Sequence, residues 1–453
     1  MRIKIKVPKG ANNLINILIS KGYDAHLVGG CVRDSILNKK PHDWDVCTSA
    51  TPDEMREIFN NFKIVDIGSK YGTLSIYSVD NFYECTTYRK EENYADGRHP
   101  NKITFSNLNN DLSRRDFTIN AIACDPYSTF IDPYNGISDI KNKIIKSVGN
   151  PDRRFKEDGL RILRAIRFQS QLGFSIEEAT KDSMNKLFPI VHNNISQERK
   201  RDELCKILTG KYVEKALMEN KEIIGLLIPE FYYCLNNFNQ KDKEHQFFLY
   251  EHIVKTVAEC PQNNLISRLA ALLHDISKPK SYVTLDGLTY FYPSNNKRSM
   301  QMAYQILSRL RFDNKTINQV CELIFHHRLI KTDAFHIKSL LNTIGEEQTE
   351  RLLLFEKANY KAKAKKPNKK KIKEINDMQK VLKKIIRKKE CYCLDMLNIS
   401  GKDIIGLGYQ EGKIIGKTLQ YLLTMVMAGT VKNKKEDLIL AAKEYLHYDI
   451  FTR

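Results

Sequence analysis

The sequence of 453 residues holds a single tryptophan, no paired cysteine motif and no long apolar run. Its ten cysteines are scattered, and Cys391 and Cys393 have no companion pair at the spacing of zinc ligands. We therefore expect reduced thiols, as in a cytoplasmic protein, and no disulfide framework. The longest apolar stretch, 419–428, is interrupted by polar residues, and the run 14–19 is too short for a signal peptide. We expect no membrane span.

Acidic residues are outnumbered. The 54 aspartates and glutamates face 73 lysines and arginines, which gives a formal net charge of +19. A positive field of this size attracts polyanions, so RNA, DNA and an anionic membrane surface are all candidate partners. A genome that favours lysine codons is the competing explanation for part of the excess. The charge supports a nucleic-acid partner without establishing one.

Secondary-structure patterns divide the chain near residue 150. Before it, segments rich in β-branched and aromatic residues predict strands at 25–28, 44–47, 73–79 and 82–88. A capped helix is predicted to begin at Thr51. After residue 150 the pattern is almost wholly helical. We predict an α+β protein, and the length is normal for two to four domains.

A glycine pair, Gly29 and Gly30, closes the first predicted strand, and Arg33 and Asp34 open a helix. Glycines let backbone amides approach a triphosphate, and the N-terminus of a helix favours negative charge. Arg33 can add a forked contact to phosphate oxygens. A glycine pair alone is weak evidence, because many strand-to-helix turns use one.

Two carboxylates follow, Asp43 and Asp45. On a strand, side chains two residues apart point to one face, so these carboxylates should lie together. They repel each other unless a cation lies between them, and hard oxygen ligands suit Mg²⁺. Two such ions could activate an RNA 3′-hydroxyl and neutralise a pyrophosphate leaving group.

Further motifs follow in a fixed order along the chain. They are ECTTYR at 84–89, RRDFTINA at 114–121, EDGLR at 157–161 and SQERKRDE at 196–203. Together with GGCVRD at 29–34 and DWD at 43–45, they resemble the signature of the polymerase-beta-type nucleotidyltransferases. That family includes bacterial CCA-adding enzymes and poly(A) polymerases.

The resemblance implies roles for the acidic residues of the head. Asp43 and Asp45 would hold the metal ions, and Gly30 and Arg33 would lie at the triphosphate. Arg115 and Asp116 would lie near the sugar and the phosphates. The third catalytic carboxylate would be Glu84 or Asp116, and the sequence leaves this choice open.

The resemblance also implies a base-reading helix. Asp158 and Arg161 are predicted to lie one turn apart on one helix face. There the pair would meet the Watson–Crick edge of C or A and act in place of a nucleic-acid template. Arg164 and Arg167 continue at the same three-residue step and would contact the triphosphate.

Residues 90–100 are charged, contain a glycine and lack apolar periodicity, which predicts a mobile loop. The segment resembles the flexible loop that complete CCA-adding enzymes need for the switch from C to A addition. Enzymes that add only CC typically lack it. It therefore favours addition of the whole CCA, while enzymes that add only A are harder to exclude.

The helical half carries a second cluster. His274 and Asp275 are adjacent at a predicted helix end, with His252 upstream, and such residues are sensible metal ligands. They resemble the HD-type phosphohydrolase domain that some bacterial CCA-adding enzymes carry. Asn295 and Asn359 depart from that pattern, because they replace a histidine and an aspartate with neutral amides. We therefore favour a degenerate, structural domain, with an active phosphodiesterase or phosphatase as the alternative.

The resemblance implies four parts: a nucleotidyltransferase head with a small mixed sheet (1–150), an all-α neck (151–240), an HD-like body (241–365) and a tRNA-binding tail (366–453). The implied reaction adds CCA to the 3′ end of tRNA from CTP and ATP, without a template, with Mg²⁺ as cofactor and pyrophosphate as product. A poly(A) polymerase or an enzyme that adds only part of CCA is the alternative. An HD phosphohydrolase with an RNA-binding head, or a pure RNA-binding module, is the alternative of another class. The oligomeric state stays open.

Overall fold

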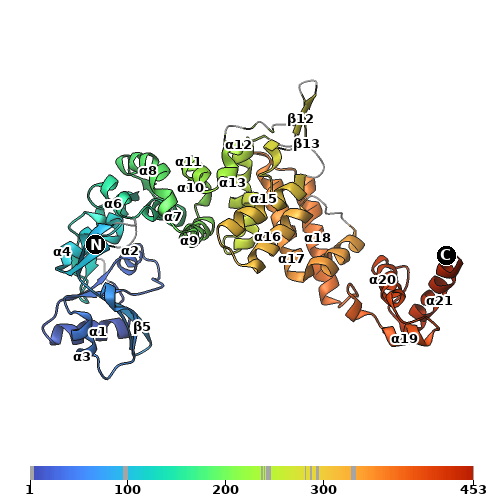
Figure 1. The fold of residues 1–453 in the computed structure, drawn as a ribbon, viewed down its shortest axis with the longest axis horizontal. Coiled ribbons are helices and arrows are strands. Elements are labelled where there is room, and N and C mark those ends of the chain that lie inside the picture. The colour runs from blue at the N-terminus through green and yellow to red at the C-terminus, as the bar shows by residue number, and fades with distance from the viewer. Residues whose placement is uncertain are drawn as a thin grey trace. The chain divides into compact units, whose positions relative to one another are not determined.

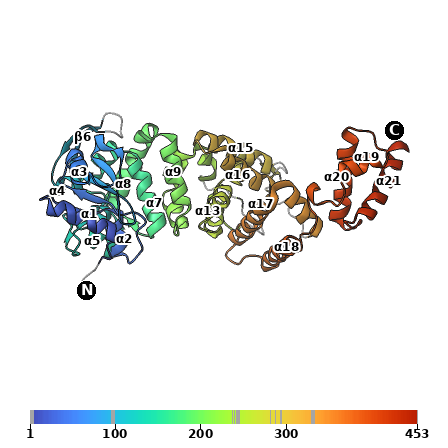
Figure 2. The same cartoon turned by 90° about the horizontal axis from the view of Figure 1, so that it is seen from below.

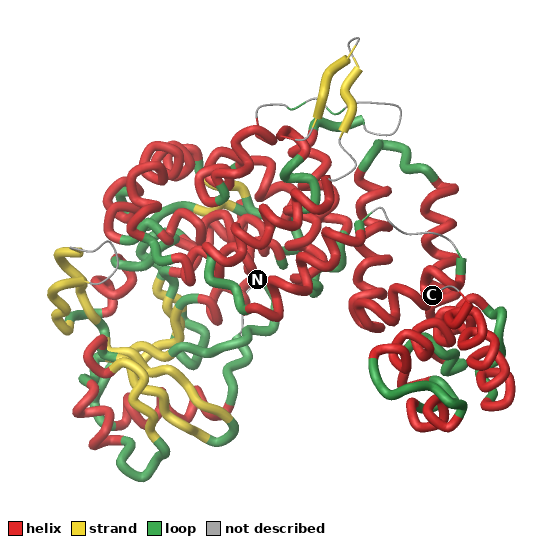
Figure 3. Tube along the Cα trace, turned by 45° about the vertical axis from the view of Figure 1, so that its right-hand side comes forward, coloured by secondary structure: helices red, strands yellow, loops and turns green. Residues whose placement is uncertain are grey.

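The computed structural model describes residues 5–94, 100–235, 238, 240, 246–280, 282–285, 288–291, 295–327 and 333–451. The chain forms two compact units, Met1–Pro229 and Glu230–Arg453. Strands gather in the first unit and the second is mainly helical, as the colours in Figure 3 show. The predicted α+β class is confirmed.

The first unit contains a seven-stranded mixed sheet in the order β3-β4-β5-β2-β1-β8-β9. Within this sheet β2 and β5 run parallel, and the other described pairs are antiparallel. The strands predicted at 25–28, 73–79 and 82–88 are confirmed to within one residue, whereas the one predicted at 44–47 begins at Val46. The strands are β1 (Ala25–Val28), β2 (Val46–Thr48), β3 (Ile64–Gly68), β4 (Thr73–Ser78), β5 (Asn81–Thr87), β8 (Ala123–Cys124) and β9 (Phe130–Ile131).

Short helices flank this sheet. Helix α1 packs against β1, β2, β4 and β5 through its buried apolar face. Helix α3 begins where the sequence predicts, because Thr51 and Glu54 cap each other's backbone amides in a capping box. The helices are α1 (Lys9–Ser20), α2 (Gly30–Ile36), α3 (Pro52–Ile58), α4 (Leu108–Ser113) and α5 (Gly136–Asn142).

The segment predicted as a loop at 90–100 is largely a β-ribbon. Strands β6 (Arg89–Tyr94) and β7 (Pro100–Phe105) pair antiparallel, with Arg89 opposite Phe105 and Tyr94 opposite Pro100. The prediction relied on apolar periodicity, whereas the pairing of two strands rests on backbone hydrogen bonds and does not require it. Residues 95–99 lie outside the described part of the chain.

Helices α6 to α11 complete the first unit (Figures 1 and 2). Helix α7 packs against α9 and α10, and α6 packs against α8. The helix predicted to carry both Asp158 and Arg161 is interrupted: α6 ends at Glu157, and Asp158 adopts an extended conformation with φ −150° and ψ 105°. The helices are α6 (Pro151–Glu157), α7 (Leu160–Leu172), α8 (Glu178–Val191), α9 (Gln197–Leu208), α10 (Val213–Glu219) and α11 (Lys221–Leu227). A short parallel pair, β10 (Ile144–Ile145) with β11 (Ser175–Ile176), links the segment before α6 to the segment after α7.

The second unit packs α13 and α14 against the long helix α17, and α15 against α16. Helix α17 is kinked at Gly345, where φ is +76°. One apolar cluster packs α17 against α18, and a second holds α19, α20 and α21 together. Its elements are α12 (Tyr232–Leu235), α13 (Leu249–Glu259), α14 (Leu265–Leu273), β12 (Tyr282–Leu285), β13 (Leu288–Phe291), α15 (Asn295–Arg309), α16 (Asn314–His326), α17 (Ala334–Ala362), α18 (Lys369–Arg387), α19 (Gly401–Gly406), α20 (Lys413–Ala428) and α21 (Lys435–Phe451). Among the described residues, no helix has the length and apolarity needed to cross a membrane.

Candidate active site

Three acidic residues lie at the start of β2 and on its neighbour β5. Asp43 and Asp45 belong to the extended segment that leads into β2. The parallel pairing sets Val46 opposite Cys85, so Glu84 lies beside Asp45. Burial, followed by the charges of Glu84 and Asp43, raises the pKa of Asp45 to about 6, although Arg115 opposes the shift. The carboxylates therefore share one negative field.

The turn before α2 passes close to these groups. Gly29 has φ +80°, and a Cβ there would lie 3.0 Å from Arg115 Nη1 and 4.0 Å from Asp45 Oδ2. Any other residue would be strained by this backbone and would crowd the arginine. Gly30 is the first residue of α2, and Arg33 follows on the same helix. The predicted glycine turn is therefore placed beside the predicted carboxylates.

A buried aspartate orients two of the arginines. Asp111 has no exposed surface and accepts from Arg114 Nη2 at 2.6 Å and from Arg115 Nη2 at 3.0 Å. Burial alone would raise the pKa of Asp111, but the charges of Arg114 and Arg115 outweigh it and lower that pKa. The pair of arginines is thus held by one carboxylate beneath the site.

Asp116 is held by a network of donors. Arg164 Nε donates to Asp116 Oδ2 at 2.7 Å, and Asn120 Nδ2 donates to Asp116 Oδ1 at 3.0 Å. Arg33 Nη1 in turn donates to Asn120 Oδ1 at 2.6 Å. Burial would raise the pKa of Asp116, yet Arg164 and Asn120 hold it well below its usual range. Asp116 is therefore a paired ion, unlike the exposed Glu84.

The predicted helix face shared by Asp158 and Arg161 is not formed, because Asp158 lies before the first residue of α7. Asp158 lies outside the helix and receives a two-pronged contact from Arg199, with Nη1 to Oδ1 at 3.2 Å and Nη2 to Oδ2 at 2.8 Å. Arg161 instead donates to Glu157 Oε2 at 2.9 Å and to the Arg114 carbonyl at 3.2 Å. Asp158 Oδ1 accepts from the Leu160 backbone amide at the start of α7 at 3.0 Å, while the same carboxylate contacts Arg199 on α9.

Arg199 and Asn120 make contacts in the site, although no role for either residue was predicted from the sequence. Arg199 lies in the SQERKRDE motif and Asn120 in the RRDFTINA motif, so a signal was available. Glu203, in the same motif as Arg199, accepts from Arg167 Nη1 at 3.1 Å. Asp111 precedes the RRDFTINA motif, and apart from the neighbouring arginines nothing in the sequence marked it as part of the site.

The predicted HD-like residues also come together. The ligand atoms of His252, His274 and Asp275 lie within 4.8 Å of one another, and all three side chains are buried. Nδ1 of His252 donates to the Ala362 carbonyl at 3.2 Å, and Nδ1 of His274 donates to the Ala271 carbonyl at 2.8 Å. Because carbonyls only accept, these bonds direct each Nε2 to Asp275, at 3.8 Å and 3.1 Å from its Oδ2.

A lysine already faces the same carboxylate. Lys278 Nζ lies 2.6 Å from Asp275 Oδ2 and donates to Gln240 Oε1 at 2.8 Å, with 1% of Lys278 exposed. His327 donates from Nδ1 to Glu356 Oε1 at 2.7 Å. Asn359 is fully buried, and neither of its amide atoms has a hydrogen-bond partner among the described residues.

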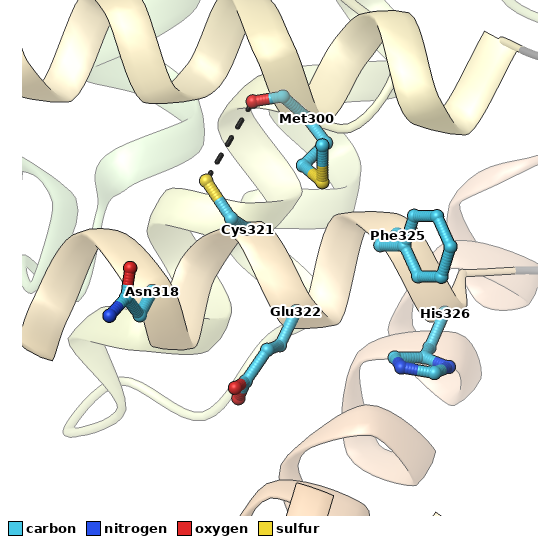
Figure 4. Close-up of a pocket in the computed structure, with 6 residues that line it drawn as sticks. All are labelled: Met300, Asn318, Cys321, Glu322, Phe325 and His326. Carbon is cyan, nitrogen blue, oxygen red and sulfur yellow. Dashed lines mark hydrogen bonds between the residues drawn. The ribbon is translucent and has the colours of Figure 1, made fainter. Parts of the chain in front are cut away.

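A separate pocket of about 370 Å³ lies along α15 and α16 (Figure 4). Its ionisable groups, Glu322 and His326, lie one turn apart, and Cys321 Sγ donates to the Met300 carbonyl at 3.7 Å. It shares no lining residue with either cluster, so it plays no part in the function proposed below.

Comparison with known proteins agrees with this geometry. Residues 25–146 match the family model "Poly A polymerase head domain", 173–234 match "Probable RNA and SrmB- binding site of polymerase A", and 296–442 match "tRNA nucleotidyltransferase domain 2". The CCA-adding enzyme of Enterococcus faecalis is 32% identical over 96% of both chains. The chain belongs to the family of CCA-adding enzymes. This membership makes it a nucleotidyltransferase.

Other members of the CCA-adding family match over different lengths. The enzyme of Oceanobacillus iheyensis is 45% identical, but over 49% of this chain and 54% of its own length. The crystal structure of the Bacillus stearothermophilus CCA-adding enzyme in complex with CTP superposes with a TM-score of 0.72 and 26% identity, covering 98% of this chain and 99% of that one. The Thermotoga maritima CCA-adding enzyme complexed with tRNA shares the fold, with a TM-score of 0.59 and 20% identity over 95% and 94% of the two chains.

Proposed function

We propose that this chain adds CCA to the 3′ end of tRNA, using CTP and ATP and releasing pyrophosphate. The observation that carries the proposal is the single site in which Asp43, Asp45 and Glu84 lie beside Arg115 and the glycine turn. The relative that matches over 96% of both chains is a CCA-adding enzyme, and the Bacillus neighbour was solved with CTP. A tRNA substrate and free thiols favour a cytoplasmic activity.

The carboxylates fit a divalent metal ion, and we propose Mg²⁺. Burial and the neighbouring carboxylates raise the pKa of Asp45, which a cation would offset, and hard oxygen donors are the ligands that Mg²⁺ prefers. The ion would neutralise charge on the phosphates and acidify the attacking 3′-hydroxyl. Asp43 and Asp45 would hold it. Glu84 is the better third carboxylate, because Asp116 is already paired with Arg164.

The arginines would bind the triphosphate and align it. Arg33, Arg164 and Arg167 carry guanidinium groups that can contact phosphate oxygens through paired N–H donors. Arg115, held by Asp111, would lie against the phosphates at the glycine turn. Positioning and charge neutralisation would supply most of the rate enhancement.

Base selection would rest on Asp158 and Arg161. C and A both carry an exocyclic amino group at the place where G and U carry a carbonyl oxygen. A carboxylate accepts from the amino group and repels the oxygen, so Asp158 would favour C and A together. Arg199 would orient this carboxylate, and Arg161 would supply N–H donors to the base.

The buried cluster of His252, His274 and Asp275 is proposed to be structural. Lys278 already places a positive charge on Asp275 in the buried interior, and Asn359 offers only a neutral amide. If the cluster is structural, Ni²⁺ and chelator will leave the unfolding midpoint unchanged, and the protein will not hydrolyse a 2′,3′-cyclic phosphate. Cyclic phosphate hydrolysis that disappears in His274→Ala would establish the phosphohydrolase alternative instead.

The decisive experiment supplies Mg²⁺ and three tRNA transcripts that end before CCA, after C or after CC. Each receives CTP, ATP or both, and the products are resolved at single-nucleotide length. Growth of all three to a common CCA end, lost in Asp43→Ala, is the expected result. Long A tails would identify a poly(A) polymerase, and growth of only some transcripts would identify an enzyme that adds part of CCA.

A further inference from the structure

Three guanidinium groups surround one aromatic ring in the first unit. The Cζ atoms of Arg33, Arg164 and Arg167 lie 5.0 Å, 5.7 Å and 4.5 Å from the centroid of Phe168. All three distances fall within the roughly 6 Å range in which a cation is attracted to an aromatic face. Arg33 comes from α2, whereas the other residues belong to α7. The ring therefore lies where two elements of the site meet.

Like charges in such a group repel each other. Burial, as the main cause, and then the charge of Arg164 lower the pKa of Arg167 to about 10. The pKa of Arg164 is raised instead, because the charges of Asp116 and Glu203 outweigh its burial. Each arginine also contacts one carboxylate. The pairs are Arg33 with Asp34 at 2.8 Å, Arg164 with Asp116 at 2.6 Å and Arg167 with Glu203 at 3.1 Å. The repulsion between the three arginines is what a polyphosphate would relieve.

A ring suits this position better than another carboxylate would. A guanidinium that lies over a ring face is attracted without using the N–H donors at its edge. Several of those donors already contact Asp34, Asp116 and Glu203, and a further carboxylate in the same place would add a fourth negative charge to the group. The ring attracts the cations and adds no charge.

Phe168 is itself fixed. It is 4% exposed, and its ring meets Phe117 edge to face, with centroids 5.8 Å apart and an interplanar angle of 85°. Phe117 has no exposed surface and belongs to the core of the unit. The platform for the three arginines is therefore anchored to the core on one side and presents cations on the other.

We propose that Phe168 is a positioning residue that holds Arg33, Arg164 and Arg167 together as a clamp for the triphosphate, independent of the base. This inference deepens the proposed function and rests on it for the identity of the nucleotide. Because the clamp recognises only phosphates, CTP and ATP should depend on it equally.

The test compares Phe168→Leu with Phe155→Leu in the full chain. Phe155 is also fully buried in this unit, on α6, so its substitution controls for lost packing. Inorganic tripolyphosphate is titrated into each variant in a calorimeter, and KM and kcat are measured for CTP and ATP on matching tRNA ends. In Phe168→Leu we expect about tenfold weaker tripolyphosphate binding and about tenfold higher KM for both nucleotides, with kcat changed less than about threefold.

Three results would overturn the inference: tripolyphosphate affinity unchanged in Phe168→Leu, an equal loss in Phe155→Leu, or a rise in KM for only one nucleotide. The calorimetry needs no catalysis, so it separates the two proposals. If the wild type binds tripolyphosphate through this clamp but extends no tRNA, the proposed function fails and the clamp stands. If extension is normal while Phe168→Leu leaves tripolyphosphate affinity unchanged, the clamp proposal is wrong and the proposed function stands.

Discussion

The contact between Asp158 and Arg199 should control base selection, and Arg199→Met tests this directly. The substitution keeps a long side chain on α9 but removes both N–H donors, at 2.8 Å and 3.2 Å from the carboxylate oxygens. The two side chains are 16% and 22% exposed, so water screens the pair only in part. A hydrogen bond to a charged group contributes about 1.5–3 kcal/mol, and with partial screening we expect a total loss of about 2–3 kcal/mol.

This loss should appear in catalysis because the carboxylate loses its orientation towards the base. At about 1.4 kcal/mol per factor of ten, kcat/KM for CTP and ATP should fall by roughly 30- to 150-fold. Discrimination against UTP and GTP should fall with it. Single-nucleotide extension of transcripts that end before CCA and after CC measures both quantities for all four nucleotides.

Arg201→Met is the matched control. Arg201 lies on the same helix, and its partner Asp202 has a side chain that is 55% exposed. Its loss should change kcat/KM by less than about twofold, as is usual for exposed ion pairs. Our account would be refuted if Arg199→Met kept wild-type rates and discrimination. Additive effects of Arg199→Met and Asp158→Asn in a double-mutant cycle would refute it equally, since residues that act through one contact must be coupled.

The remaining predictions concern the metal site and the buried amide of the second unit. Asp43→Ala should slow single-turnover extension by at least about a thousandfold without moving the unfolding midpoint, and a loss of only a few fold would exclude it as a metal ligand. Because Asp45 has its pKa raised to about 6, protons should compete with Mg²⁺ below that pH. The apparent Mg²⁺ affinity should be about tenfold weaker at pH 5 than at pH 7, and an affinity independent of pH would contradict this assignment. The same raised pKa stabilises the fold at low pH, and this contribution is lost as the pH rises through about 6; Asp45→Asn should flatten that part of a denaturation profile. Asn359→Leu should raise the free energy of unfolding by about 1–2 kcal/mol in urea titrations, because it removes a buried amide that lacks partners, and a lower midpoint would show that the amide is needed.

Local signals in the sequence predicted most of the elements. Thr51 and Glu54 mark the start of α3, and β-branched segments mark β1, β4 and β5. They failed at the ribbon of β6 and β7, because strands can pair through backbone hydrogen bonds without apolar alternation in the sequence. They also failed at Asp158, because one residue in an extended conformation interrupts a pattern that stays helical on both sides.

The sequence identified the candidate residues of the site better than it identified the contacts between them. Asp43, Asp45, Arg33 and Arg115 could be named because their motifs are dense and ordered. The choice of Glu84 over Asp116 as the third carboxylate required the register of β2 against β5 and the ion pair with Arg164. Sequence spacing contains neither fact.

By itself, the sequence determined the class of fold, the order of the motifs, the positive charge and the candidate ligands, since each depends on residue type and short-range spacing. Only the tertiary structure decided which charged groups are in contact with one another. It paired Asp158 with Arg199 across 41 positions and brought Arg33 of α2 to the ring of Phe168 on α7. The physical reason is that electrostatic and hydrogen-bond energies depend on separations of a few ångströms and on burial. Those separations are fixed by how helices and strands pack, which local pattern does not encode.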